Sequence, residues 1–359
     1  MNVRINSVLF IQVIPDIRTN KIANVLSQAG IQTDLLYLKT HPAEVYRGYS
    51  LPYSRIFKLR MIKEIVEFVD QSSYDLVISC NEPDIISAVL ACSTKPVIHD
   101  CHDMMSLRGD ITNDQAILEF IANKYASANI YVTDLIKEIA VQRFGLSNKP
   151  VTVLDNYVLR EQLPQQYLPK LSQTDGEIHC VYEGGLTNRS DHHRNIEPVL
   201  LALAQEKVHV HYYTPFQSSY YSMLEQKSPY LHWEGTREPN ELIYEMTRYD
   251  VGLTVLHVTE RNKPFLDSTF PNKAWDYLAA GLPILFSDLT SFQQFLKSYA
   301  VGRILDLSGH LFEQVRAASL IPINPGFLND YRLTMEDQSD RLVEFLEEAV
   351  ISFYKRSRE

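Results

Sequence analysis

A base and an acid lie three residues apart in the segment FPNKAWDYLAAGLPILFSD, residues 270–288. Lys273 and Asp276 fall on the first turns of a predicted helix that begins at Pro271 and stops at Gly281, because proline suits a helix start and glycine a helix end. Free N–H groups and the positive end of a helix dipole suit a diphosphate. A carboxylate one turn further on can accept the hydroxyl protons of a ribose. The pattern indicates either a nucleotide site or a helix–strand unit with two solvated charges.

Glycines and a basic residue follow another predicted strand. Gly184 and Gly185 come directly after the apolar run 178–182, and glycines there allow a ligand to approach the backbone closely. Arg194, with Arg189 as the second choice, precedes the next predicted helix. An arginine at this place would stabilise negative charge on a leaving diphosphate. The alternative is a basic surface loop.

A histidine beside a carboxylate follows a strand in the first half, in the segment HDCHD at 99–103. Such a pair can hold a sugar hydroxyl or act as a base. We expect His102 and Asp103 to bind or orient a substrate; the alternative is a capping loop with a packed histidine. Other polar residues that can reach the same edge follow the preceding strand: Asn81, Glu82 and Asp84.

Short apolar strands alternate with helices along the chain, which is typical of parallel sheets covered on both faces. Strands are predicted at 7–14, 34–38, 75–79, 96–99, 129–133 and 151–154, then at 178–182, 208–212, 250–256, 283–286 and 301–305. Helices are predicted at about 21–29, 55–69, 84–92, 115–126 and 134–144, then at 195–206, 220–226, 240–247, 272–280 and 336–355. The polar stretch 159–176 is predicted as an interdomain linker.

The fold class is therefore α/β, with two Rossmann-like domains at 1–160 and 177–325 and a C-terminal segment at 326–359. A chain of 359 residues is too long for one ordinary core. No GxGxxG follows the first predicted strand, which argues against a dehydrogenase.

The segment PNK-x-x-D-Y-L-A-A-G-L-P-I, residues 271–284, resembles the nucleotide-sugar-binding segment of GT-B glycosyltransferases, in particular the family-four-like group. The resemblance implies two domains facing a cleft and a terminal helix that returns to the first domain. It implies that Asp276 binds the donor ribose. The other donor-binding residues that it implies are Gly184, Gly185, Arg189, Arg194, Gly235, Thr236, Pro271, Asn272 and Lys273. The catalytic residues that it implies are His102, Asp103, Arg194 and Lys273.

The implied reaction moves a sugar from a nucleoside-diphosphate sugar, UDP or GDP, to a hydroxyl of a saccharide or lipid-linked acceptor. The resemblance also implies retention at the anomeric carbon, a role in surface polysaccharide or glycoconjugate synthesis, and no metal or other cofactor.

One position departs from the family pattern. Many members carry a second acid eight residues before the ribose carboxylate, and it contacts the sugar ring. That position is Ser268 here, with Asp267 beside it. The departure favours one alternative, a non-catalytic GT-B partner subunit of a transferase. A GT-B nucleotide-sugar epimerase is the other alternative.

The composition of the chain limits the binding partners and the cellular compartment that we expect for it. The formal net charge of -10 argues against a general nucleic-acid binder. The four cysteines show no CxxC spacing, so we expect neither zinc nor disulfides, as suits a cytoplasmic protein. We expect no signal peptide, and no stretch approaches the roughly 20 apolar residues of a membrane span.

The stretch 45–63 is basic and rich in aromatic residues in an otherwise acidic chain. It contains no acid, and its bases are Arg47, Arg55, Lys58, Arg60 and Lys63. That composition is typical of a peripheral membrane surface, which would place the protein at the inner face of the membrane. The alternative is a loop and helix whose apolar face lies in the core.

Overall fold

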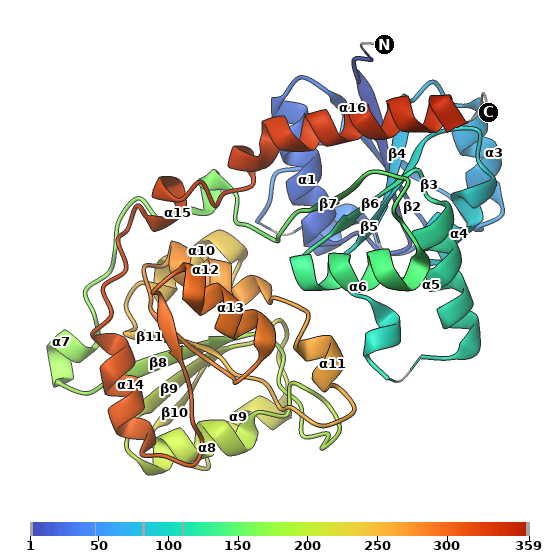
Figure 1. Ribbon diagram of the computed structural model, residues 1–359. Helices are drawn as coiled ribbons and strands as arrows, with labels where there is room; N and C mark the ends of the chain where they lie inside the picture. Colours follow the sequence, from blue (N-terminus) through green and yellow to red (C-terminus); the bar gives the residue numbers. More distant parts are fainter. Residues whose placement is uncertain (1–2, 47, 81–82, 110, 357–359) are drawn as a thin grey trace. The chain divides into compact units, whose positions relative to one another are not determined.

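The computed structural model describes residues 3–46, 48–80, 83–109 and 111–356. Arg47, Asn81 and Glu82, which the sequence singled out, lie outside these ranges. The chain divides into two units (Figure 1): the first combines Met1–Asn156 with Met335–Glu359, and the second is Tyr157–Thr334. Each unit has its own parallel sheet.

The first unit is built on a seven-stranded sheet in the order β3-β2-β1-β4-β5-β6-β7. Its strands are β1 (Ser7–Gln12), β2 (Gln32–Tyr37), β3 (Arg55–Lys58), β4 (Leu76–Cys80), β5 (Val97–Cys101), β6 (Ala128–Tyr131) and β7 (Val151–Val153). All neighbouring pairs run parallel. The order reverses between β1 and β4, and ligands of open α/β sheets bind where the order reverses, at the carboxyl ends of the strands.

Helices cover this sheet. They are α1 (Ile17–Gln28), α2 (Pro42–Val45), α3 (Glu64–Gln71), α4 (Ile85–Val89), α5 (Asn113–Tyr125), α6 (Asp134–Phe144) and α16 (Ser339–Arg356). The C-terminal helix α16 packs against α1 (Figure 1), and Arg356 Nη2 donates to the carbonyl of Ser127 at 2.9 Å. Its apolar stripe is buried, as the helical spacing of these residues predicts: Leu342, Phe345, Leu346, Ala349 and Val350.

The prediction of one helix over 55–69 is wrong in its first part, because Arg55–Lys58 is the edge strand β3. Asp34 of β2 fixes this pairing: its carboxylate accepts the Arg55 N–H at 2.8 Å and the Arg55 Nε at 2.9 Å. Helix α3 begins only at Glu64. The ion pair joins residues that are distant in sequence, so the local hydrophobic pattern could not predict that 55–58 forms a strand.

The second unit is built on a six-stranded sheet in the order β10-β9-β8-β11-β12-β13. Its strands are β8 (His179–Glu183), β9 (His209–Tyr213), β10 (Leu231–Gly235), β11 (Val251–Thr254), β12 (Ile284–Phe286) and β13 (Gly302–Ile304). All neighbouring pairs are again parallel. The order reverses between β8 and β11, which makes the carboxyl end of β8 the expected ligand site.

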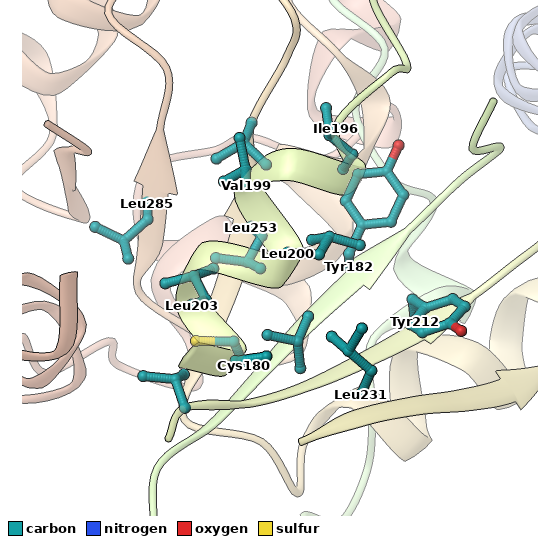
Figure 2. Close-up of a cluster of buried hydrophobic side chains, with 14 of the residues drawn as sticks. Cys180, Tyr182, Ile196, Val199, Leu200, Leu203, Tyr212, Leu231, Leu253 and Leu285 are labelled. Atoms are coloured by element: carbon teal, nitrogen blue, oxygen red, sulfur yellow. The ribbon is translucent and has the colours of Figure 1, made fainter. Parts of the chain in front are cut away.

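Helices α8 (Glu197–Gln205) and α9 (Ser219–Glu225) lie on one face of this sheet, and α10 (Pro239–Met246), α12 (Asn272–Ala279) and α13 (Thr290–Ser298) lie on the other (Figure 1). The remaining helices are α7 (Ser172–Asp175), α11 (Lys263–Leu266), α14 (Leu311–Ser319) and α15 (Phe327–Asp330). Figure 2 shows Leu200 and Leu203 of α8 packed over Cys180 and Tyr182 of β8. This core fixes α8 and the end of β8 to each other.

The stretch 159–176, predicted as a linker, lies within the second unit. Leu171 N–H donates to the Arg248 carbonyl at 2.9 Å, and Ser172 Oγ donates to Asp250 at 2.6 Å. Lys170 Nζ donates to the Tyr249 carbonyl. The stretch 159–176 is therefore held by hydrogen bonds to residues 248–250, directly before β11.

Candidate functional site

The predicted loop–helix–strand segment forms helix α12, a tight turn and strand β12. Pro271 stands at the N-cap, with φ −81° and ψ 143°, one residue before the helix. Gly281 follows the end of the helix in the left-handed region, with φ +70°, where glycine is the favoured residue. The first turn of α12 therefore begins at Asn272 and Lys273 and presents backbone N–H groups that a helix leaves free.

Tyr277 fixes α12 to the sheet. The backbone N–H of Glu183, at the end of β8, donates to Tyr277 Oη at 2.9 Å, and Tyr277 Oη donates to the Leu253 carbonyl of β11 at 3.2 Å. The ring lies against Gly252, where an added Cβ would be 2.4 Å from Tyr277 Cγ. A glycine at 252 is therefore required for α12 to approach the strands this closely.

Lys273 reaches from α12 to the glycine turn after β8. Its Nζ lies 3.7 Å from the centroid of the Tyr182 ring. Gly184 has φ +126°, and a Cβ there would be 3.2 Å from Lys273 Nζ. Only glycine suits both the backbone conformation and the space that the ammonium group takes.

Arg194 lies against the second glycine of the same turn. A Cβ on Gly185 would be 3.1 Å from Arg194 Nη1. The Arg194 carbonyl accepts the Thr187 N–H at 3.3 Å, and its own N–H donates to His192 Nδ1 at 3.1 Å. The two predicted cations thus lie over neighbouring glycines.

Arg189, the second choice, lies elsewhere in this loop. It forms a bidentate pair with Asp191, with Arg189 Nη2 at 3.0 Å from the carboxylate. Both side chains are exposed, so this pair contributes little to stability. Arg194 is the better candidate for the diphosphate.

Burial and the neighbouring charges determine the pKa of Lys273. Burial lowers the pKa of Lys273 to about 7, while the carboxylates of Glu183 and Asp276 oppose this shift and Arg194 adds to it. Glu183 is itself buried at the end of β8. An anion bound beside Lys273 would favour its charged form, since an opposite charge raises the pKa of an amine. The sequence did not single out Glu183, although it directly precedes the predicted glycine pair.

The position of the expected second acid has no carboxylate. Ser268 is buried, and its Oγ donates to the Phe265 carbonyl at 2.9 Å. Asp267 accepts from Lys263 Nζ at 2.7 Å and from the Thr290 N–H at the start of α13 at 2.9 Å. Burial raises the pKa of Asp267, but these hydrogen bonds outweigh it and the pKa is lowered. Asp267 therefore has a structural role here.

Gly235 and Thr236 stand at the carboxyl end of β10, two strands from β8. Gly235 has φ +78°, and its carbonyl accepts the Thr214 N–H at 2.9 Å. Thr236 is exposed. They lie at the same edge of the sheet as the glycine turn, as the parallel topology requires.

In the first unit, Asp100 is held inside the sheet rather than presented to a ligand. Arg18 Nε and Nη2 donate to its two oxygens, each at 2.8 Å, and Cys80 Sγ donates to it at 2.9 Å. Burial raises the pKa of Asp100, but Arg18 outweighs it and the pKa is lowered. Arg18 Nη1 also donates to Asn156 at 2.7 Å.

His102 and Asp103 follow β5 and are half-buried. Burial raises the pKa of Asp16, at the start of α1, and an electrostatic interaction with His102 opposes the shift. His99, in contrast, is fully buried, with Nδ1 at 2.8 Å from Ser87 Oγ. The sequence did not single out Asp16, which adds a carboxylate to the His102 edge.

The basic stretch 45–63 is partly internal. Tyr46 is buried and Phe57 packs on the core of the first unit, while Arg55 pairs with Asp34 at 2.8 Å. The basic and large apolar side chains of the stretch that are exposed, among its described residues, are Leu51, Arg55, Lys58, Arg60, Met61 and Lys63.

In the part of the chain that the structure describes, no helix combines the length and the apolar character needed to cross a bilayer. Nor does any group of three or more histidine, cysteine or acidic side chains there have a metal-binding arrangement.

Residues 18–161 match the model of the family described as Glycosyltransferase Family 4. Sucrose-phosphate synthase from Thermosynechococcus elongatus is similar in structure, with a TM-score of 0.62 at 13% identity over 98% of both chains. Anabaena HepE in complex with UDP-glucose gives 0.63 at 13% identity, covering 98% of this chain and 97% of that one. WaaG, a glycosyltransferase involved in lipopolysaccharide biosynthesis, gives 0.60 at 13% identity, covering 96% and 99%.

A search of curated proteins found no match to the sequence. The structural matches extend over both units and confirm the GT-B fold. The family match over residues 18–161 supports the resemblance to family-four-like transferases that residues 271–284 predict. The individual site residues stay predictions.

Proposed function

We propose that this chain, a glycosyltransferase of GT-B fold that matches family four over residues 18–161, moves a sugar from a nucleoside-diphosphate sugar to an acceptor hydroxyl. One observation carries the proposal: Lys273 and Arg194 lie over the adjacent glycines 184 and 185, at the carboxyl end of β8 and beside the start of α12. Two cations, a glycine turn and a helix start suit a diphosphate.

Asp276 would bind the ribose of the donor. It lies one turn after Lys273 on α12, and Tyr277 fixes that helix to β8 and β11. The carboxylate is therefore carried on an anchored element, as recognition of paired hydroxyls requires.

In the proposed reaction, the acceptor oxygen bonds to the anomeric carbon while the bond from that carbon to the diphosphate oxygen breaks. The acceptor proton passes to the leaving phosphate oxygen, so no protein base is required. Lys273 and Arg194 stabilise the charge that develops on the diphosphate. We propose retention at the anomeric carbon by analogy with the family, and turnover without a metal ion because these two side chains supply positive charge.

UDP is the first nucleotide to test. HepE, a structural neighbour at 14% identity, has a structure in complex with UDP and glucose. Gly235 and Thr236, at the same edge of the sheet, are the proposed contacts to the base. GDP is the alternative, and a comparison of nucleotides separates the two.

His102 and Asp103 would bind the acceptor, with Asp16 near His102. A half-buried imidazole near a carboxylate can orient a sugar hydroxyl. We propose a saccharide or lipid-linked acceptor, in surface polysaccharide or glycoconjugate synthesis.

The exposed side chains Leu51, Lys58, Arg60, Met61 and Lys63 support peripheral membrane contact. Bases with apolar neighbours attract an anionic bilayer. Co-sedimentation with vesicles of anionic and of neutral lipid tests this. We expect the wild type to bind anionic vesicles and the double variant Lys58→Glu, Arg60→Glu not to bind them. Equal binding of the wild type to both kinds of vesicle would contradict the proposal.

A thermal-shift panel of UDP, GDP, ADP, CMP and their sugar derivatives tests the donor site. A nucleotide at 100 times its dissociation constant adds about 2.7 kcal/mol of stability. We expect one diphosphate to raise the melting temperature of the wild type and not of Asp276→Ala. No shift with any nucleotide would remove the proposal.

A non-catalytic GT-B partner subunit is the second candidate. The structural use of Asp267 and the burial of Ser268 favour it, because no acid then occupies the family's sugar-contacting position. Slow hydrolysis of the bound nucleotide sugar separates the two: turnover that Asp276→Ala abolishes supports the transferase, and binding without any turnover supports the subunit.

A further inference from the structure

Tyr182 connects the hydrophobic core of the second unit to the proposed diphosphate site. It is 1% exposed, and Figure 2 shows its ring beside Ile196 and Leu200 of the core. The centroid of the same ring lies 3.7 Å from Lys273 Nζ. One side chain thus contacts both the packed interior and a proposed catalytic cation.

The hydroxyl of Tyr182 contacts the glycine turn. It donates to the Gly185 carbonyl at 3.1 Å, and a Cβ on Gly184 would lie 3.4 Å from it. The hydrogen bond holds the turn whose two glycines accommodate Lys273 and Arg194. The ring and the hydroxyl therefore act on different parts of the site.

Lys273 is half-buried, and a ring in this place offsets part of the cost of removing water from its ammonium group. Burial removes water from Lys273 and disfavours its charged form. The face of an aromatic ring carries partial negative charge and attracts a cation that lies over it. Without the ring, Lys273 would keep the burial and lose this compensation.

We propose that Tyr182 is a positioning residue, whose ring holds the Lys273 ammonium over the Gly184–Gly185 turn and whose hydroxyl holds the turn itself. This inference rests on the proposed donor site, since it gives Lys273 its role. It adds a buried core residue that sets the charge and the place of Lys273, the group proposed to bind the diphosphate.

The direct test measures the titration of Lys273 without any nucleotide. Lysines are labelled by reductive methylation with ¹³C-formaldehyde, and Lys273→Arg identifies the signal of Lys273. The variants are Tyr182→Phe, which keeps the ring, and a chain with trifluorophenylalanine at position 182, which keeps the shape but removes the negative ring face. Because both are close in size to tyrosine, the core is preserved.

We expect Tyr182→Phe to keep the wild-type titration midpoint and the fluorinated ring to lower it by about one pH unit. An unchanged midpoint with the fluorinated ring would overturn the role of the ring. The matched control is Tyr212→Phe, which removes another buried hydroxyl bond in the same core, from Tyr212 Oη to the Tyr221 carbonyl at 2.7 Å. It should leave the Lys273 midpoint unchanged.

Nucleotide binding then tests the hydroxyl. We expect Tyr182→Phe to weaken diphosphate binding about threefold to tenfold at pH 7, since one hydrogen bond to the turn is lost, and Tyr212→Phe to leave it unchanged. Equal affinity in wild type and Tyr182→Phe would overturn the role of the hydroxyl. If the wild type binds no nucleotide while the fluorinated ring still shifts the midpoint, the proposed function fails and the ring–ammonium interaction stands.

Discussion

The protonation of Lys273 should control diphosphate binding at neutral pH. Its pKa is about 7 because of burial, and its ammonium form is the one that attracts a phosphate. Above pH 7 the free protein must therefore take up a proton to bind, and the dissociation constant should rise up to about tenfold per pH unit.

Titration calorimetry with a nucleoside diphosphate between pH 7 and 9 measures this, since the last phosphate proton, with a pKa of about 6, is already lost there. Lys273→Arg should bind with little pH dependence, because arginine stays charged. Lys297→Arg, at an exposed position on α13, should behave like the wild type. A wild-type affinity that stays constant from pH 7 to 9 contradicts the assignment of Lys273.

At Gly252, even the methyl group of alanine should destabilise the fold. A Cβ would lie 2.4 Å from Tyr277 Cγ, and neither a strand backbone nor an aromatic ring can yield that much without strain. We expect Gly252→Ala to lower the free energy of unfolding by about 1–3 kcal/mol and to weaken nucleotide binding through displacement of α12.

Gly326→Ala is the matched control, because its Cβ would meet Asp330 at 3.4 Å, an ordinary contact, and its φ is −84°. Its effect should stay within about 0.5 kcal/mol. Denaturant unfolding of both variants measures the two free energies. Equal stability of Gly252→Ala and Gly326→Ala would show that the packing of Tyr277 does not require a glycine at position 252.

At the scale of elements, Asp267 joins α11 to the first turn of α13. It accepts from Lys263 Nζ and from the Thr290 N–H, so Asp267→Ala should cost about 1 kcal/mol of stability, as loss of a helix cap does. Donor affinity should not change, because the carboxylate is used within the fold. A tenfold loss of affinity for the nucleotide sugar, with unchanged affinity for the nucleotide alone, would instead show that Asp267 reaches the sugar.

At the scale of the whole molecule, each unit contains a buried histidine that resists protonation. Burial lowers the pKa of His99 to about 3 in the first unit and that of His211 to about 4 in the second. The unfolded chain, with histidine pKa values near 6.5, binds more protons than the folded chain below that pH. The stability from these groups is therefore complete above pH 6.5 and falls as the pH drops toward the folded values.

Between pH 6.5 and 5 the loss should be up to about 2 kcal/mol per histidine. Calorimetric melts across this range measure it. His211→Gln should reduce the pH dependence of the stability of the second unit and leave the pH dependence of the first unit unchanged. A melting profile of the wild type that does not change from pH 6.5 to 5 would contradict the burial of neutral imidazoles.

Local sequence determined the elements whose signals are contained in neighbouring residues. The helix from Asn272 and its glycine stop, and the parallel strands of two α/β units, follow from apolar runs and from the conformational limits of proline and glycine. The motif at 271–284 also predicted the fold that the structural matches confirm. Strand β3 was predicted as helix because its pairing depends on Asp34, which is 21 residues from Arg55.

Only the tertiary structure decided which predicted residues share a site. It brought Lys273 and Arg194 to one glycine turn, paired Arg189 with Asp191, and placed the Asp267 carboxylate at the first turn of α13. It also revealed Tyr182 and Tyr277, which as buried aromatic residues look like any core residue in sequence. The physical reason is that a strand or helix depends on contacts within a few residues, whereas a site depends on where separate elements end, and packing between distant segments sets those ends.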